Sequence, residues 1–128
     1  MVYTWSFSIV FAEEFKQFPS PDQDKILDFT EIYETHGLSD FSKYEGKISP
    51  SWSGNISQDN HSYAQDNALW HYHIGIPDYQ QRHSAYKTSD WVLHFQWKNR
   101  GDHITIVDLY SHYKTDGTFY LPPEDYLE

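Results

Sequence analysis

Three stretches, LWHYHIGI at residues 69–76, WVLHFQWK at 91–98 and ITIVDLYSHY at 104–113, decide the fold that this sequence predicts. Each alternates between two sets of side chains, and this period of two is typical of a β-strand with different surroundings on its two faces. In the first stretch Trp70, Tyr72 and Ile74 share a face, and the second repeats the pattern with apolar residues at 91, 93, 95 and 97. The turn residues at 99–102 predict that the second and third strands form a hairpin.

Histidines lie on the opposite face of the first two strands. His71 and His73 alternate with the aromatic residues, and His94 takes the equivalent position in the second strand. A histidine changes its charge near neutral pH, so several of them on one face can form a proton-transfer site. By the same alternation, the third strand is expected to have one face made of Ile104, Ile106, Asp108, Tyr110 and His112.

The residues before these strands predict helices that cover the aromatic face of the sheet. Residues 3–11 (YTWSFSIVF) predict a first strand, and residues 12–18 a short helix. A longer helix is expected over 21–35, with Pro21 in its first turn and Gly37 as its stop. Between this helix and the strand at 69–76, residues 38–68 predict short strands near 44–48 and 51–56, and a surface loop over 57–67.

Composition limits the class of protein and the kind of partner. The 128 residues suffice for one domain, and the lack of cysteine excludes disulfides and thiolate metal sites. We expect no signal peptide and no membrane partner, since no apolar run approaches the roughly 18 residues of a membrane span, and hence a cytoplasmic location. The net charge of −10 argues against non-specific nucleic-acid binding. Residues 82–114 carry five basic and three acidic side chains, a net of +2, so the rest of the chain carries −12.

The order of these segments resembles the RelE-superfamily toxins of bacterial type II toxin–antitoxin systems. The resemblance lies in the first 38 residues and, more specifically for the YafO-type branch, in three short motifs: His71-Tyr-His73-Ile, Tyr86-Lys-Thr-Ser-Asp90 and a strand ending in Ser111-His112. It implies one α+β domain over 1–128, a RelE-like twisted antiparallel sheet with N-terminal helices packed on one face, followed by a short acidic tail at 121–128.

The resemblance also implies a function. Proteins of this superfamily cleave mRNA, typically at the ribosome, and a cognate antitoxin protein silences them. We therefore expect an endoribonuclease without metal or other cofactor, with mRNA, the ribosome and an antitoxin as partners, and without direct DNA binding. This chain departs from the superfamily in having only two arginines and a strongly acidic balance, which weighs against docking on ribosomal RNA.

Metal-free RNA cleavage needs a base for the 2′-hydroxyl, an acid for the leaving 5′ oxygen and a cation for the phosphorane. We expect His71 or His73 to be the base and His112 the acid, with Lys87 and Arg82 holding the phosphate. Unpaired bases can stack on Tyr86 or Trp97. The expected catalytic residues are His71, His73, Lys87, Asp90 and His112, and the expected RNA-contacting residues are Arg82, Tyr86, Trp97, Arg100 and Lys114.

The same residues allow other interpretations. His71, His73, Asp108 and His112 have the spacing of a zinc or iron site, although the Glu and glycines of a cupin are missing. Histidines on a half-exposed sheet are also commonly solvated, and the segment ending at Asp90 can be a simple turn. An acidic, aromatic-rich domain further suits an immunity protein that covers the basic active site of a nuclease without catalysis of its own.

Overall fold

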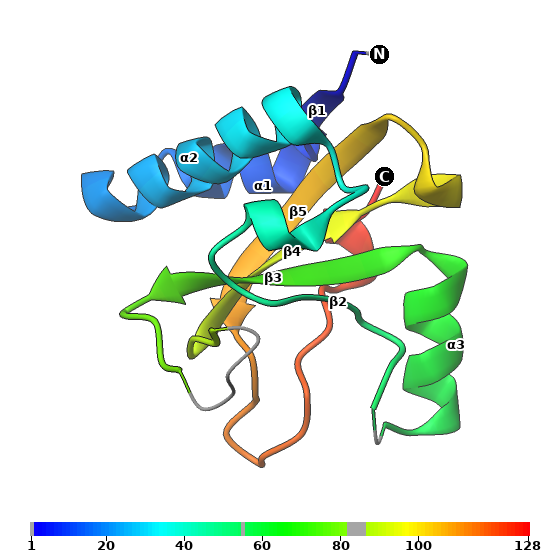
Figure 1. Ribbon diagram of the computed structural model, residues 1–128. Helices are drawn as coiled ribbons and strands as arrows, with labels where there is room; N and C mark the ends of the chain where they lie inside the picture. Colours follow the sequence, from blue (N-terminus) through cyan, green and yellow to red (C-terminus); the bar gives the residue numbers. More distant parts are fainter. Residues whose placement is uncertain (1, 55, 82–86) are drawn as a thin grey trace.

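Residues 2–54, 56–81 and 87–128 are described by the structure, a computed structural model in which one mixed sheet has the strand order β1-β5-β4-β3-β2. Helices α1 and α2 lie across one face of this sheet (Figure 1). The expected α+β class is therefore confirmed, as is the packing of the N-terminal helices on one face. The strands are β1 Thr4–Phe7, β2 Ile48–Pro50, β3 Leu69–Ile76, β4 Trp91–Gln96 and β5 His103–Ser111, and the α-helices are α1 Ile9–Phe15, α2 Ser20–His36 and α3 Gln58–Asp66.

The meander of β3, β4 and β5 forms as its alternation predicts. Its two neighbouring pairs are antiparallel, and the short helical turn Lys98–Arg100 closes the β4–β5 hairpin. The expectation of a wholly antiparallel sheet is wrong at one edge, where β1 runs parallel to β5 with Thr4 opposite His103. No hairpin constrains this pair, because helices α1, α2 and α3 and strands β2, β3 and β4 separate β1 from β5 along the chain.

The first strand is shorter than the alternation predicts. It ends at Phe7, and Ser8 caps α1 by accepting a hydrogen bond from the Phe11 backbone N–H at 3.4 Å. Helix formation turns Phe11 into the core, where its ring lies 5.3 Å from that of Phe7. A capping hydroxyl and aromatic burial therefore override the strand preference of residues 9–11.

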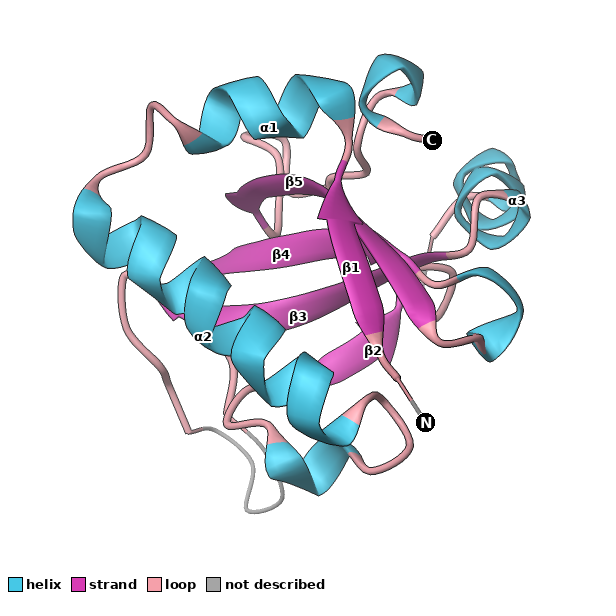
Figure 2. Ribbon diagram, turned by 90° about the horizontal axis from the view of Figure 1, so that it is seen from above, coloured by secondary structure: helices cyan, strands magenta, loops and turns pink. Residues whose placement is uncertain are grey.

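Helix α2 matches the prediction for 21–35 to within one residue at each end. Gly37 ends it at a φ of 63°, a conformation that favours glycine. Figure 2 shows from above how α2 lies across the sheet, and the buried residues of the helix pack on the aromatic face of the sheet. Phe29 is central to this contact, because its ring stacks on Tyr72 at 4.9 Å and contacts Phe95 at 5.7 Å.

The middle of the chain differs most from expectation. The strand expected near 44–48 is the three-residue β2, and the described residues of 51–56 form turns and bends instead of a second strand. The surface loop expected over 57–67 is wrong, because Ser57 caps α3 with a hydrogen bond from the Asn60 backbone N–H at 3.2 Å. Ala64 then packs with Leu69 and Val107 in a second apolar cluster beneath the sheet.

A bulge in β5 corrects the expected faces of the third strand. His94 pairs with Asp108 whereas Phe95 pairs with Ile106, so Val107 is an extra residue. Consequently Ile104 and Ile106 belong to the helix-side core, but Asp108 lies opposite His94 on the other side. A strict period of two cannot continue through an inserted residue, so Asp108 does not share a face with the isoleucines.

The histidine face of the sheet is covered rather than open to solvent. After β5 the chain folds back on itself, with Tyr113 paired to Phe119 and the Tyr120 N–H donating to the His112 carbonyl at 3.0 Å. We call residues 112–120 the covering hairpin; it hangs below the sheet in orange in Figure 1. The C-terminal residues continue the cover, since Leu121 and Leu127 pack on the second apolar cluster. In the part of the chain that is described, no helix is long and apolar enough to cross a bilayer.

Candidate functional site

Three histidine side chains converge on the covered face of the sheet. His71 and His73 project together from β3, and His112 follows β5, where its backbone N–H donates to the Asp90 carbonyl at 2.7 Å. One ring nitrogen from each of the three lies within 4.8 Å of the other two. The rings of His73 and His112 stack, with centroids 5.1 Å apart and planes 25° apart, and the ring of His71 meets both edge-on. We call these three residues the histidine trio.

His73 is held by one backbone residue in either of its neutral forms. Its Nδ1 lies 2.9 Å from the Ser89 carbonyl oxygen and 3.0 Å from the Ser89 backbone nitrogen. A protonated Nδ1 donates to the carbonyl, and a deprotonated Nδ1 accepts from the N–H. The other nitrogen, Nε2, can therefore carry a lone pair or a proton without loss of the contact that orients the ring.

The ring of His71 is fixed by Ser51, the residue that follows the neighbouring strand β2. Its Nδ1 lies 2.9 Å from the Ser51 hydroxyl, and the side chain is buried. A fourth histidine, His94, lies 6.2 Å from it, ring to ring, and is 0% exposed. Neither ring nitrogen of His94 has a hydrogen-bond partner among the described residues. His94 therefore lies behind the trio as a packed neutral ring.

Burial keeps these imidazoles in their neutral form. Desolvation is the largest cause of the lowered pKa of each of the four histidines, and it lowers the pKa of His94 to about 3 and that of His112 to about 4. The positive charge of Lys47 further lowers the pKa of each member of the trio. At pH 7 the trio is a set of neutral imidazoles with lone pairs available.

Two adjacent hollows reach the trio from solvent. The larger hollow has a volume of about 530 Å³ and the smaller one about 270 Å³. His73, His112, Lys47 and Tyr113 line both, whereas His71 lines only the smaller. Phe119 of the covering hairpin also borders the smaller hollow, with its ring 5.0 Å from His71 and 4.8 Å from His112. Small molecules and chain segments can thus reach His73 and His112 from two sides.

The structure brings together only some of the expected catalytic residues. His71, His73 and His112 form the trio, and Asp90 lines the larger hollow. Lys87 points elsewhere, because its ammonium forms an ion pair with Glu45 at 2.8 Å. The expected contributions of Arg82 and Tyr86 lie outside the described residues.

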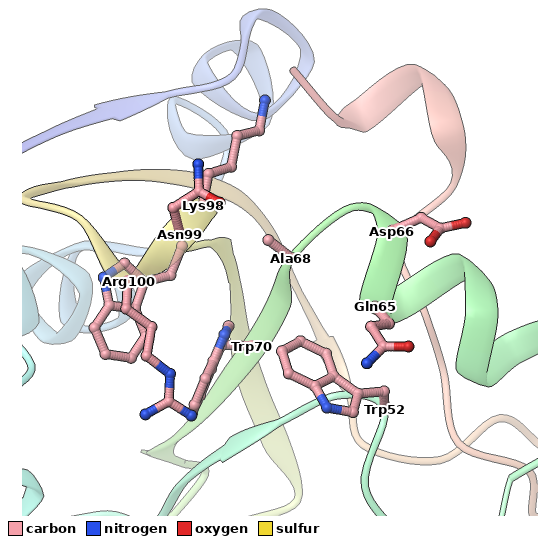
Figure 3. Close-up of a pocket in the computed structure, with 9 residues that line it drawn as sticks. Trp52, Gln65, Asp66, Ala68, Trp70, Lys98, Asn99 and Arg100 are labelled. Carbon is pink, nitrogen blue, oxygen red and sulfur yellow. The ribbon is translucent and has the colours of Figure 1, made fainter.

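Two of the expected RNA-contacting residues lie at a different place. Trp97 is part of the helix-side core, and Arg100 lies over its ring and that of Trp70, at 5.6 and 5.2 Å. Figure 3 shows this tryptophan hollow of about 410 Å³, between the end of α3 and the β4–β5 connection. Trp70, which lines this hollow, alternates with His71 along β3 and therefore faces away from the trio. Lys114 is exposed on the covering hairpin, two residues beyond His112.

The metal set considered from sequence spacing is realised in part. The trio supplies three possible ligands, but Asp108 is not among them. Its carboxylate instead accepts hydrogen bonds from the Tyr120 hydroxyl and from the Leu109 backbone N–H. The bulge in β5 explains why Asp108 is not a possible ligand, because it pairs Asp108 with His94.

Four residues that shape the site were not predicted: Lys47, Ser51, Ser89 and Phe119. Lys47 and Ser51 come from the stretch of weakest sequence pattern, and only strand pairing with β3 brings them to the histidines. Ser89 had a signal, because it belongs to the Tyr86–Asp90 motif. Its role there is to orient His73 with its backbone, and its hydroxyl accepts from the Gly75 N–H at 3.1 Å.

Comparison of the chain with models of protein families, with curated proteins and with solved structures found no significant match.

Proposed function

We propose that this protein is the toxin of a toxin–antitoxin pair, an endoribonuclease that cleaves single-stranded mRNA with His73 as base and His112 as acid. One observation carries the proposal: three imidazoles converge beside two hollows that Lys47 also lines. Catalysis of this kind needs a base and an acid within reach of one phosphodiester, and a cation beside them.

The roles divide according to which ring each hollow reaches. His73 and His112 border both hollows, whereas buried His71 borders one. In the reaction, Nε2 of His73 takes the 2′-hydroxyl proton, the 2′ oxygen forms a bond to phosphorus, and the bond from phosphorus to the 5′ oxygen breaks. His112 gives its proton to that leaving oxygen, and the negative phosphate favours the protonated form of His112 in the complex. His71, ring to ring with both, is a positioning residue.

Lys47 supplies the positive charge beside the phosphate that the sequence pattern assigned to Lys87 and Arg82. The backbone of Lys47 is anchored on both sides, since its carbonyl accepts from the His73 N–H and its N–H donates to the Lys87 carbonyl, each at 2.9 Å. Lys47 lines both hollows, where a cation would stabilise the charge that develops on the phosphorane. Trp91 and Tyr113 line the larger hollow and provide faces on which unpaired bases can stack.

The proposal includes a cytoplasmic site of action and a cognate antitoxin. The net charge of −10 favours RNA presented to the hollows as a single strand over broad electrostatic docking. An antitoxin that covers Tyr113 and the mouth of the larger hollow would block access to both proposed catalytic histidines.

The test is cleavage of a single-stranded RNA by the purified chain in EDTA, with and without ribosomes. The expected products end in 2′,3′-cyclic phosphate, and 2′-O-methyl RNA of the same sequence resists cleavage because it lacks the nucleophile. His73→Ala and His112→Ala each lower the rate by about 10²–10⁴-fold, the usual contribution of a general acid or base. His61→Ala, on α3 and away from the trio, is the matched control and keeps the rate.

Expression in cells supplies the second arm of the test. The wild-type chain arrests growth, and the His73→Ala and His112→Ala variants do not. A chain that neither cleaves RNA nor arrests growth contradicts the proposal.

An immunity protein is the second candidate, and one observation favours it. The solvent side of α2 carries the exposed acidic residues Asp28, Glu31 and Glu34, a ridge complementary to a basic nuclease. Charge complementarity of this kind speeds association. A harmless chain that rescues cells from a nuclease toxin would establish this function, and α2 charge-reversal variants would then lose the rescue.

A further inference from the structure

The histidine trio has the donor set of a transition-metal site. Three imidazole nitrogens lie within 4.8 Å of one another, and among the described residues no carboxylate joins them. Imidazole nitrogen suits zinc, copper, nickel and iron, whereas magnesium, calcium and manganese prefer oxygen ligands. Zn–N bonds of about 2.1 Å in a tetrahedron place two nitrogens roughly 3.4 Å apart. Rotations that move the ring nitrogens by about 1 Å would therefore close the trio around one ion.

The surroundings of the trio are those of metal-bound histidines. A ligating histidine usually donates its second ring N–H to a carbonyl, carboxylate or other acceptor, which fixes the ring and its tautomer. Nδ1 of His73 has the Ser89 carbonyl at 2.9 Å, and Nδ1 of His71 has the Ser51 hydroxyl at 2.9 Å. In both rings Nε2 is then the nitrogen that carries the lone pair.

The third ring and the hollows complete the arrangement. His112 Nδ1 is buried without a hydrogen-bond partner among the described residues. Because His73 and His112 line both hollows, a fourth coordination position would face solvent. Three protein ligands with one open position distinguish a reactive or exchangeable site from a closed structural one.

We propose that the histidine trio binds one divalent transition-metal ion, Zn²⁺ in the first instance, and that the bound ion switches off RNA cleavage. Binding itself does not depend on the proposed function, whereas the inhibition rests on it. An imidazole nitrogen that donates its lone pair to a metal cannot take a proton from a 2′-hydroxyl. The same atoms therefore serve either the ion or the reaction.

Lys47 sets the balance between the two states. Lys47 lines both hollows beside the trio, and its positive charge lowers the pKa of all three histidines, so it opposes a divalent cation and favours a phosphate. Lys47→Met removes that charge and keeps a side chain of similar length. We expect this variant to bind Zn²⁺ more tightly than the wild type and to cleave RNA more slowly, two effects of opposite sign from one substitution.

Binding is measured by titrating the metal-free chain with Zn²⁺ in a calorimeter and by competition with a coloured zinc chelator. The expected result is one ion per chain. His112→Ala removes a ligand from a half-buried position and weakens binding by at least about 100-fold, or two factors of ten in the dissociation constant. Ser51→Ala keeps all three ligands but removes the partner of His71, and weakens binding by about 10–100-fold. His61→Ala and His103→Ala, which change histidines outside the trio, leave binding unchanged.

Circular dichroism of each variant shows whether it is folded, and Ser51→Ala tests the trio even where a ligand variant is unstable. Absence of one-to-one binding, or binding that persists in both His112→Ala and Ser51→Ala, overturns the metal site. The cleavage assay contains EDTA, and Zn²⁺ is then added in excess over the EDTA. A cleavage rate that stays constant or rises on this addition overturns the proposed inhibition. The two proposals separate cleanly, because zinc binding without cleavage in EDTA refutes only the nuclease, and cleavage without zinc binding refutes only the metal site.

Discussion

Asp108 is a buried carboxyl group whose replacement by asparagine should stabilise the protein at neutral pH. The side chain is 3% exposed, and its oxygens accept from the Tyr120 hydroxyl and the Leu109 backbone N–H. Burial raises its pKa from 3.8 to about 6, against the opposing effect of these two hydrogen bonds, and the negative charge of Glu14 adds to the rise. The carboxylate therefore costs free energy in the folded chain.

The sign and size of the effect follow from the two pKa values. Below pH 3.8 the carboxyl is largely protonated in both the folded and the unfolded chain, so the free energy of unfolding carries no cost from a buried charge. As the pH rises from 3.8 to about 6, the carboxyl loses its proton in the unfolded chain but keeps it in the folded chain. The free energy of unfolding therefore falls over this range. Each pKa unit corresponds to about 1.4 kcal/mol, so the loss between about pH 4 and pH 7.5 is about 3 kcal/mol.

The substitution Asp108→Asn keeps a side chain of similar shape that does not titrate. We expect equal free energies of unfolding for variant and wild type near pH 4, and a variant about 3 kcal/mol more stable at about pH 7.5. Urea denaturation followed by tryptophan fluorescence at several pH values across this range measures the difference. Asp28→Asn, an exposed change on α2, is the matched control substitution. A difference between Asp108→Asn and wild type that is independent of pH would refute the reasoning.

Three further substitutions test the covered face. Tyr120→Phe removes the hydroxyl that donates to Asp108 and favours its charged form. The free energy of unfolding, measured with urea, should fall by about 1.5–3 kcal/mol at pH 8 and by less at pH 5. Equal losses at the two pH values would contradict this. His94→Phe removes a ring without hydrogen-bond partners among the described residues, so the thermal midpoint at pH 7 should hold or rise, and a clear fall would show a missing partner. Gly46→Ala would place Cβ 1.7 Å from the His73 carbonyl oxygen. It should lower stability by at least about 1–3 kcal/mol and, under the proposed function, slow RNA cleavage. A variant with wild-type stability would contradict the packing of this loop.

Much of the sheet and half of the site were predictable because they depend on local periodicity. Alternation along β3 puts His71 and His73 on one face whatever the rest of the chain does, and the helix over 21–35 follows from its apolar stripe and its terminal Pro21 and Gly37. The failures share one cause. In β1, α3 and β5, single local features decided the outcome: a capping serine in the first two and an inserted Val107 in the third.

The sequence by itself determined the α+β class, the central meander and the segregation of histidines from aromatic residues, because a strand's side chains alternate by covalent geometry alone. Only the tertiary structure decided that His112 meets His73, that Lys47 and not Lys87 borders both hollows, and that residues 112–120 cover the histidines. Those contacts join segments far apart in the chain. Their geometry depends on strand order, register and one bulge, which no local pattern encodes.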